Sequence, residues 1–253
     1  MEYINFKSIV TIAFIILMSQ TELLAQNGKL YQAGYNGNVY LFGFNSDETI
    51  SIIGAPSDTD WNRWSILHDG SVYRLYFMAI GKSNILYQFG YNPFSGDYEY
   101  GYESKQIIEI AGLPNNANVT GFSILFDGSY YRLYFKSSNN YSLYQCAYDF
   151  SSQKYRFGYE SIPEIKIKNA PSDVDLRSWS MLYDGEAYRL YFKSISKDNY
   201  LYQFGFNGIS YEYGYNSTPV IKVEGMPFRN YTKKFNITFD GSDYRYYNLE
   251  VVN

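Results

Sequence analysis

The chain has 253 residues, of which 46% are hydrophobic and 18% charged, so it is long enough for one large folded domain or two small ones. Its 21 Lys and Arg against 25 Asp and Glu give a net charge of −4, which argues against a nucleic-acid partner because such proteins carry a basic surplus. A single Cys and a single His exclude a disulfide framework and a Cys- or His-rich metal site.

The first predicted element is an export signal. Residues 9–18 form an apolar run, Lys7 precedes it, and Ala25 offers a small residue at a cleavage point. A membrane-spanning helix needs about 20 apolar residues, so this run is too short to be one. We expect residues 1–25 to be a secretory signal peptide that is removed, which would leave a secreted, periplasmic or extracellular protein with no membrane insertion. An uncleaved N-terminal anchor helix is the alternative.

The rest of the chain consists of four copies of one sequence unit. Its clearest segment recurs at residues 64–77, 122–135, 179–192 and 235–248. A Leu-Tyr-Gln segment and a proline marker share the same period of about 57 residues. The chain starts with the second half of a unit and ends with the first half. We therefore predict one split unit, 28–60 plus 235–253, and three whole units at 61–121, 122–178 and 179–234.

Each unit is predicted to be β-structure. In residues 64–77, Asp69 and Gly70 stand between two runs of aromatic and β-branched residues, which is the strongest local signal for a β-hairpin. A two-residue turn there would place Ile66 opposite Tyr73. Further strands are expected at residues 85–91, 98–102 and 107–110, and no segment of residues 26–253 shows a sustained helical period.

These units predict an all-β fold, a four-bladed β-propeller of about 57 residues per repeat. A twisted sheet of four strands that is packed on both faces by identical neighbours is a propeller blade. The first and last strands would share one blade, which closes the ring without an exposed edge. An open solenoid would need distinct capping repeats, and a β-trefoil would need three units.

In repeat number and length, residues 26–253 resemble the hemopexin-like four-bladed propellers, a family that includes seed albumins of similar size. The Gly-x-Pro stretch before a new unit, seen at Gly225 and Pro227, is part of the resemblance. The family's Asp-Ala-Ala-Phe opening strand is replaced here by an aromatic-Ser-Ile/Met-Leu segment. The disulfide that joins first and last blades in many members cannot form with one Cys. The resemblance therefore implies an architecture and leaves the function open.

Polar residues that recur in every copy are the first candidates for a ligand site. An Arg recurs on a strand of otherwise apolar residues, and buried Arg is rare unless it is paired. Each Arg either pairs within the scaffold or donates to sugar hydroxyls or an acidic ligand. A Gln between aromatic residues either bonds neighbouring strands or contacts a ligand. The eight candidates are Arg74, Arg132, Arg189, Arg245, Gln32, Gln88, Gln145 and Gln203.

Tyrosine is the compositional anomaly, with 31 residues. Tyr100 and Tyr213 each lie at the centre of a Tyr-x-Tyr-x-Tyr pattern, which places three rings on one face of a strand. Packing between blades is one interpretation of this pattern. Exposed Tyr also suits carbohydrate and protein recognition, since it combines an apolar ring with a polar tip. Tyr100 and Tyr213 therefore join the candidate ligand-binding residues.

Catalysis finds little support. No nucleophile elbow, zinc-binding or phosphate-loop motif occurs. Asp69 and its copies are predicted to form turns, because Asp before Gly suits a tight turn. His68 and Cys146 stand where the other copies have aromatic residues, so both are expected to pack in the core. We predict no enzyme, and no metal or cofactor.

We expect a secreted, non-catalytic binding module with repeated carbohydrate sites, similar to a lectin. Near-identical polar and Tyr positions in the copies motivate this hypothesis, because packing alone needs fewer of them. A hemopexin-like protein-interaction or storage propeller without a small ligand is the alternative. A recent duplication would preserve the same positions, so the repetition does not separate the two. The partner is accordingly a glycan or an extracellular protein.

Overall fold

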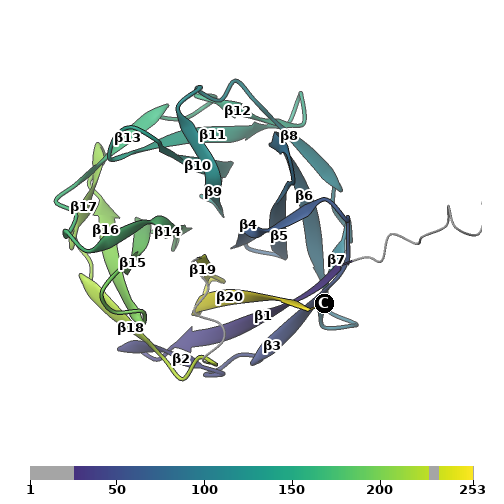
Figure 1. The fold of residues 1–253 in the computed structure, drawn as a ribbon, viewed down its shortest axis with the longest axis horizontal. Coiled ribbons are helices and arrows are strands. Elements are labelled where there is room, and N and C mark those ends of the chain that lie inside the picture. The colour runs from purple at the N-terminus through teal and green to yellow at the C-terminus, as the bar shows by residue number, and fades with distance from the viewer. Residues whose placement is uncertain (1–25, 228–233, 253) are drawn as a thin grey trace, which may run out of the picture.

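The computed structural model describes residues 26–227 and 234–252, which contain 20 β-strands arranged in a ring (Figure 1). The all-β prediction is confirmed for this part of the chain. The predicted signal peptide, residues 1–25, lies outside the described residues. No helix long and apolar enough to cross a membrane occurs in the described ranges.

Strand pairing divides the 20 strands into four sets of five, which we call repeats A to D. Repeat A contains β4 (Thr59–His68), β5 (Tyr73–Ala79), β6 (Lys82–Asn92), β7 (Asp97–Tyr100) and β8 (Ile107–Ala111). Repeat B contains β9 (Ala117–Phe126), β10 (Tyr131–Ser137), β11 (Ser142–Asp149), β12 (Lys154–Phe157) and β13 (Glu164–Lys168). Repeat C contains β14 (Val174–Tyr183), β15 (Tyr188–Ser194), β16 (Tyr200–Phe206), β17 (Ser210–Tyr213) and β18 (Val220–Glu224). Repeat D contains β19 (Phe235–Phe239), β20 (Tyr244–Val252), β1 (Gln26–Tyr35), β2 (Val39–Phe42) and β3 (Thr49–Ala55).

Within a repeat, antiparallel strands run outward from the axis of the ring. In repeat A, β4 pairs with β5 and β5 pairs with β6. The outer edge of β6 then pairs with β7 along one half and with β8 along the other. Figure 1 shows the innermost strands β4, β9, β14 and β19 around the axis. This radial arrangement of antiparallel sheets is that of a β-propeller.

Repeat D joins the two ends of the described chain. β1 pairs antiparallel with β20 in an eight-residue register that runs from Asn27 opposite Val252 to Gly34 opposite Arg245. The predicted pairing of the first and last strands is therefore present. It covers the edges that these strands would otherwise expose.

Neighbouring repeats are also bonded to each other at the perimeter. Parallel pairs form between β3 and β7, β8 and β12, β13 and β17, and β18 and β2. The twelve outer strands therefore form one closed hydrogen-bonded ring, with a pair of inner strands attached in each repeat. The sequence did not indicate these bonds, because parallel pairing between distant segments leaves no local pattern.

The predicted hairpin is present in every repeat, but its predicted register is wrong by two residues. Ile66 lies opposite Leu75, not opposite Tyr73. The connection is four residues long, because the carboxylate of Asp69 accepts the backbone amides of Ser71 and Val72 at 3.1 and 3.0 Å. Since the shift is by two, every side chain stays on its predicted face.

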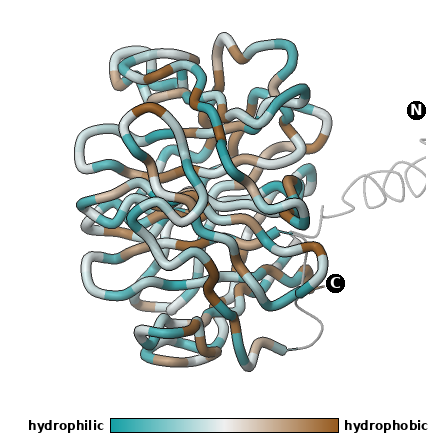
Figure 2. Tube along the Cα trace, turned by 90° about the vertical axis from the view of Figure 1, so that its left-hand side faces the viewer, coloured by the Kyte–Doolittle hydropathy of each residue, from teal (hydrophilic) through white to brown (hydrophobic). Residues whose placement is uncertain are grey.

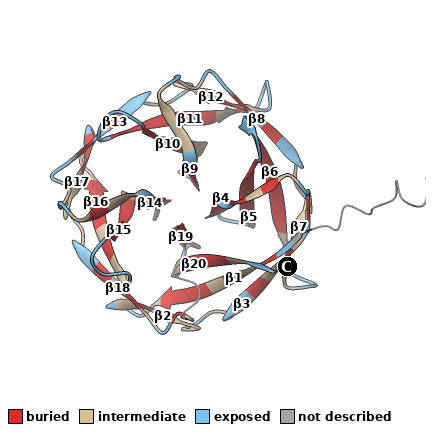
Figure 3. Cartoon of the chain, viewed as in Figure 1, coloured by how far each residue is buried: buried red, intermediate tan, exposed pale blue. Residues whose placement is uncertain are grey.

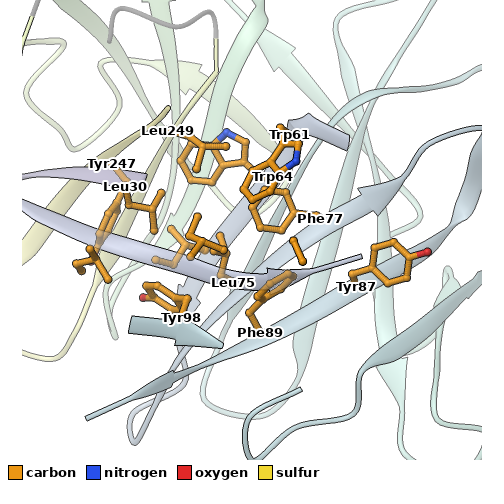
Figure 4. Close-up of a cluster of buried hydrophobic side chains, with 14 of the residues drawn as sticks. Leu30, Trp61, Trp64, Leu75, Phe77, Tyr87, Phe89, Tyr98, Tyr247 and Leu249 are labelled. Carbon is orange, nitrogen blue, oxygen red and sulfur yellow. The ribbon is translucent and has the colours of Figure 1, made fainter. Parts of the chain in front are cut away.

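The hydrophobic core lies between the repeats. Figure 4 shows one such contact, in which Trp64 and Phe77 of repeat A meet Leu249 of repeat D. The perimeter strands β8 and β13 alternate exposed and buried residues, and exposed residues concentrate in the outer loops (Figure 3). Hydrophobic and hydrophilic residues accordingly alternate along the chain (Figure 2).

Serines join the innermost strands around the axis. Ser65 accepts the backbone amide of Ile124 at 2.9 Å, so it bonds repeat A to repeat B. The same bond recurs from Met181 to Ser123 at 2.9 Å and from Ile237 to Ser180 at 3.0 Å. The side-chain amide of Asn236 donates to Ser65 at 2.9 Å. These bonds complete a ring of four contacts that holds the repeats together at the centre.

Candidate ligand-binding site

The four candidate Arg residues occupy equivalent places and are all paired within the scaffold. In repeat A, Arg74 Nε lies 3.4 Å from Asp69 Oδ2, and its Nη1 donates to the carbonyl of Glu103 at 3.3 Å. The corresponding Arg–Asp pairs are Arg132 with Asp127 at 2.6 Å, Arg189 with Asp184 at 3.5 Å and Arg245 with Asp240 at 3.1 Å. The Arg therefore ties the hairpin turn to a perimeter loop of the same repeat.

Each turn aspartate also bonds to the next repeat. The hydroxyl of Tyr131 in repeat B donates to Asp69 Oδ2 in repeat A at 2.9 Å. The same bond joins Tyr188 to Asp127 at 3.0 Å, Tyr244 to Asp184 at 3.2 Å and Tyr73 to Asp240 at 2.8 Å. The aspartates form the turns, as predicted, and in addition link neighbouring repeats. The sequence analysis did not single out these tyrosines.

The electrostatics of this link keep the aspartate charged and the tyrosine neutral. Burial by itself would raise the pKa of Asp69. Hydrogen bonds from the Val72 amide and the Tyr131 hydroxyl, together with the charge of Arg74, lower this pKa by more than burial raises it, so the pKa lies below its usual range. Burial, together with the bond to Asp69, raises the pKa of Tyr131 to about 12. Tyr131 is therefore a hydrogen-bond donor at neutral pH.

The four candidate Gln side chains are buried without a partner. Gln88 lies in β6 where the outer edge passes from β7 to β8, and its backbone amide and carbonyl bond to Gln106 and Gly101, each at 3.0 Å. Gln32, Gln88, Gln145 and Gln203 are only 5 to 7% exposed. Within residues 26–227 and 234–252, their side-chain amides form no hydrogen bond. The amide atoms themselves are not fully buried, so they are free to bond a ligand.

Arg and Gln converge on cavities at three interfaces between repeats. The A–B pocket has a volume of about 230 Å³ and is lined by Arg74, Gln88, Ser104, Tyr131 and Tyr148 among others. The D–A pocket, about 410 Å³, is lined by Arg245, Gln32, Ser46, Tyr73 and Tyr91. The C–D pocket, about 260 Å³, is lined by Arg189, Gln203, Ser217, Tyr244 and Tyr35. The three pockets are thus built from equivalent residues.

A serine that the sequence analysis missed belongs to each pocket. The hydroxyl oxygens of Ser46, Ser104 and Ser217 are buried and have no hydrogen-bond partner among the residues that the structure describes. In the fourth copy, the hydroxyl of Ser161 donates to the carbonyl of Gln145 at 3.4 Å. The available signal was a Gly-aromatic-Asn/Glu-Ser segment that recurs at 43–46, 101–104, 158–161 and 214–217.

The residue before each of these serines has a left-handed backbone. The φ angles are 46° at Asn45, 42° at Glu103, 43° at Glu160 and 43° at Asn216. A non-glycine residue in this region costs about 1–3 kcal/mol and is found mainly at functional sites. Here the conformation turns the carbonyl of the residue toward the Arg of the same repeat, as for Asn216 and Arg189 at 2.6 Å.

Tyr100 and Tyr213 do not line the three pockets. Tyr100 packs on Tyr87 and Phe89, with ring centroids 5.9 and 5.4 Å away. Tyr213 packs in the same way in repeat C, 5.6 Å from Phe204. In the strand of Tyr100, the residue that lines a pocket is Tyr98, two positions earlier on the same face. The structure therefore separates these two candidates from the Arg and Gln residues.

The single His and the single Cys do not line the three pockets. His68 packs 4.6 Å from the ring of Tyr73. Cys146 is fully buried, and burial raises the pKa of its thiol to about 12, so the thiol stays protonated. In the described ranges there is no group of three or more His, Cys, Asp or Glu that could hold a metal ion.

No family model and no curated protein matches this sequence. Among solved structures, the chain is similar to AofleA from Arthrobotrys oligospora, with 14% identity and a TM-score of 0.40 over 85% of this chain and 61% of that one. It is also similar to the Aleuria aurantia lectin, described as a six-bladed β-propeller with a fucose recognition mode, with 14% identity and a TM-score of 0.40 over 86% and 69%. SapL1 lectin, solved with α-methyl fucoside, gives 15% identity and a TM-score of 0.32 over 77% and 56%. These values are too low to transfer a ligand to this chain.

Proposed function

We propose that this chain is a four-bladed β-propeller that binds carbohydrate in the pockets between its blades and catalyses no reaction. Each of repeats A to D would be one blade, which the strand pairing and the four sequence copies support. The hemopexin-like resemblance supports this number of blades and nothing about the ligand. Residues 1–25 support a location outside the cytoplasm.

The observation that carries the proposal is the repeated, unpartnered Gln and Ser pair in each pocket. A fully buried Ser hydroxyl without a partner costs about 1–3 kcal/mol, and the described chain carries this cost at three equivalent places, while the Gln amides beside them are not fully buried and are free to bond a ligand. A ligand with several hydroxyl groups would remove the cost, because each hydroxyl donates one bond and accepts others. In the A–B pocket, the Gln88 amide and the Ser104 hydroxyl would bond such a ligand.

The remaining pocket groups fit the same ligand class. Arg74 brings a positive charge and Tyr148 an aromatic ring to the A–B pocket. Aromatic rings pack against the apolar C–H faces of sugars, while their hydroxyl edges stay polar. Two of the cavities, about 230 and 260 Å³, are smaller than drug-sized sites, and the third, about 410 Å³, is in the lower part of that range, so these volumes suit a small ligand such as one sugar unit. Several equal sites on one ring would gain strength on a multivalent glycan surface.

The turn aspartates that pair with the pocket Arg residues are poorly placed for catalysis. Asp69 is already bonded to the turn amides, Arg74 and Tyr131, and its lowered pKa opposes a role as proton donor. A protein-binding propeller is the second candidate. It is favoured by apolar side chains on the perimeter turns, since Phe94 is 93% and Ile209 77% exposed.

A glycan array with residues 26–253, followed by calorimetric titration, tests the proposal. We expect the triple variant Gln32→Met, Gln88→Met and Gln203→Met to lose binding without loss of stability, because Met keeps the shape and removes the unpartnered amides. Tyr100→Phe with Tyr213→Phe is the control and should bind as the parent does. A blank array, or full binding by the triple variant, would overturn carbohydrate binding in these pockets.

A further inference from the structure

We infer that the fourth interface, between repeats B and C, is closed to ligand and that Ala147 closes it. One chain would then carry three ligand sites, not four. This inference rests on the proposed function, because it assumes that the A–B, C–D and D–A pockets bind ligand. It adds which interfaces bind and which residue decides this.

A glycine lies beneath the pocket loop in the other three repeats. Gly34, Gly90 and Gly205 each pair directly with the pocket Arg of the neighbouring strand. A Cβ atom added to them would lie 2.0, 2.1 and 2.0 Å from the carbonyl oxygens of Phe44, Tyr102 and Tyr215, respectively. No real Cβ contact is that short. The pocket loops therefore need glycine at this position in order to reach their place.

Repeat B has Ala147 at this position. Ala147 pairs with Arg132 in the same register and is fully buried. Directly opposed residues of an antiparallel pair project to the same face, so the methyl group lies on the face of Arg132. The carbonyl of Tyr159 therefore cannot occupy the place that its three counterparts occupy, although Gly158 still donates to the Gln145 carbonyl at 3.1 Å as in the other repeats.

Two polar contacts of the B–C interface differ from their counterparts at the other three interfaces. Ser161 donates to the Gln145 carbonyl at 3.4 Å, whereas its three counterparts are buried and unpartnered. Arg132 Nη1 contacts the Glu160 carbonyl, and Arg132 Nε lies 2.6 Å from Asp127, closer than in any other repeat. Both Arg contacts occur in every repeat, so the differences at this interface are the shorter Arg–Asp distance and the partner of Ser161.

Two further side chains at the B–C interface differ from their counterparts at the other three interfaces. The ring of Tyr130 lies 4.7 Å from the guanidinium carbon of Arg132, where the other repeats have Val72, Ala187 and Asp243. Phe206 stands where Tyr35, Tyr91 and Tyr148 line the other pockets, so one hydroxyl is missing. Gln145 resembles its three counterparts in burial and forms no side-chain hydrogen bond in the described chain, so this residue does not distinguish the B–C interface.

Native mass spectrometry of residues 26–253 counts the sites. The probes are the methyl glycosides of fucose, galactose, mannose and N-acetylglucosamine, each titrated to saturation. We expect at most three bound copies of any probe that binds. Gln88→Met should lower the number to two, and the matched variant Gln145→Met should leave it at three. Four copies on the parent protein, or loss of one by Gln145→Met, would overturn the inference.

The variant Ala147→Gly with Tyr130→Val should open the fourth site and raise the number to four. If it still binds three copies, Ala147 is not the determinant and the inference fails. If none of the four glycosides binds the parent, the proposed binding of these sugars fails. Crystal structures of the unliganded parent and the variant then test the inference separately. Loop 158–161 should then pack closer to β11 in the Ala147→Gly variant than in the parent, and an unmoved loop would overturn the inference.

Discussion

Two sets of serines recur around this ring, and they differ in one respect. The axial serines Ser65, Ser123 and Ser180 are fully buried, and each accepts a backbone amide from the next repeat. The pocket serines, Ser46, Ser104 and Ser217, have equally buried hydroxyls that bond to nothing in the described chain. Both sets are repeated, so repetition does not separate scaffold from site. Hydrogen-bond saturation distinguishes these two serine sets, and unsaturated buried hydroxyls also occur outside the pockets at Thr59, Ser178 and Thr238.

Deleting the two C-terminal strands, which close the ring, should have the largest effect on stability. Deleting residues 235–253 removes β19 and β20, hence the partner of β1 and the bond from Ile237 to Ser180. Because the ring closes through β20, we expect all four repeats to lose cooperative stability, not repeat D alone. Calorimetric unfolding of residues 26–253 and of the deletion variant measures this. An unchanged unfolding temperature would show that the ring does not depend on its closure.

A single axial serine should have the next largest effect. Ser123→Ala leaves the backbone amide of Met181 buried without an acceptor, where it now bonds at 2.9 Å. We expect the free energy of unfolding to fall by about 1–3 kcal/mol, the cost of stranding a buried donor. Urea denaturation followed by tyrosine and tryptophan fluorescence measures it. A loss below about 0.5 kcal/mol would contradict the structural role of the axial serines.

The period, the strand content and the pairing of the chain ends could be predicted from the sequence. Period-two alternation and Asp-Gly pairs such as Asp69-Gly70 are local signals, and each repeat shows them again. The register of the hairpin could not be predicted, because Asp69 closes a four-residue connection through its own side chain. The parallel bonds between repeats depend on positions that only the closed ring brings together.

The candidate site was predicted in part. The Arg and Gln residues recur on apolar strands, and the structure brings both types together in three pockets, for example Arg74 with Gln88. Ser104 was missed because a serine in a loop looks solvent-exposed in a sequence, and its burial comes from the left-handed Glu103 before it. Tyr100 was favoured over Tyr98 because alternation fixes the face of a strand but not the position along it.

The tyrosine–aspartate bonds between repeats should give the ring an alkaline limit. Burial first, then the bond to aspartate, raises the pKa of Tyr131 to about 12, whereas an unfolded Tyr titrates near 10. The folded state then holds more protons than the unfolded one between these values, so stability is full below pH 10 and falls as the pH rises toward 12. Urea denaturation at intervals from pH 8 to pH 12 measures this slope.

In that window, Tyr131→Phe should flatten the fall in stability, because one tyrosine with a raised pKa is removed. At pH 8 the variant should be less stable than the parent, since Asp69 loses a donor. The two curves therefore converge as the pH rises. Tyr141→Phe is the control, because Tyr141 is 52% exposed. Parallel curves for Tyr131→Phe and the parent would show that this bond does not couple to the ionisation of Tyr131.

The smallest effect on stability is expected for a pocket serine, because its hydroxyl has no hydrogen-bond partner in the described chain. Ser104→Ala removes a buried hydroxyl that has no partner, so the free energy of unfolding should stay within about 0.5 kcal/mol of the parent or rise slightly. The same change should weaken glycan binding at the A–B pocket, because the ligand loses one of its acceptors there. Ser161→Ala is the matched control, and it should leave binding unchanged, since Ser161 already bonds to Gln145. If Ser104→Ala destabilised the ring as much as Ser123→Ala, the pocket serine would be part of the scaffold, and saturation would not distinguish the two sets.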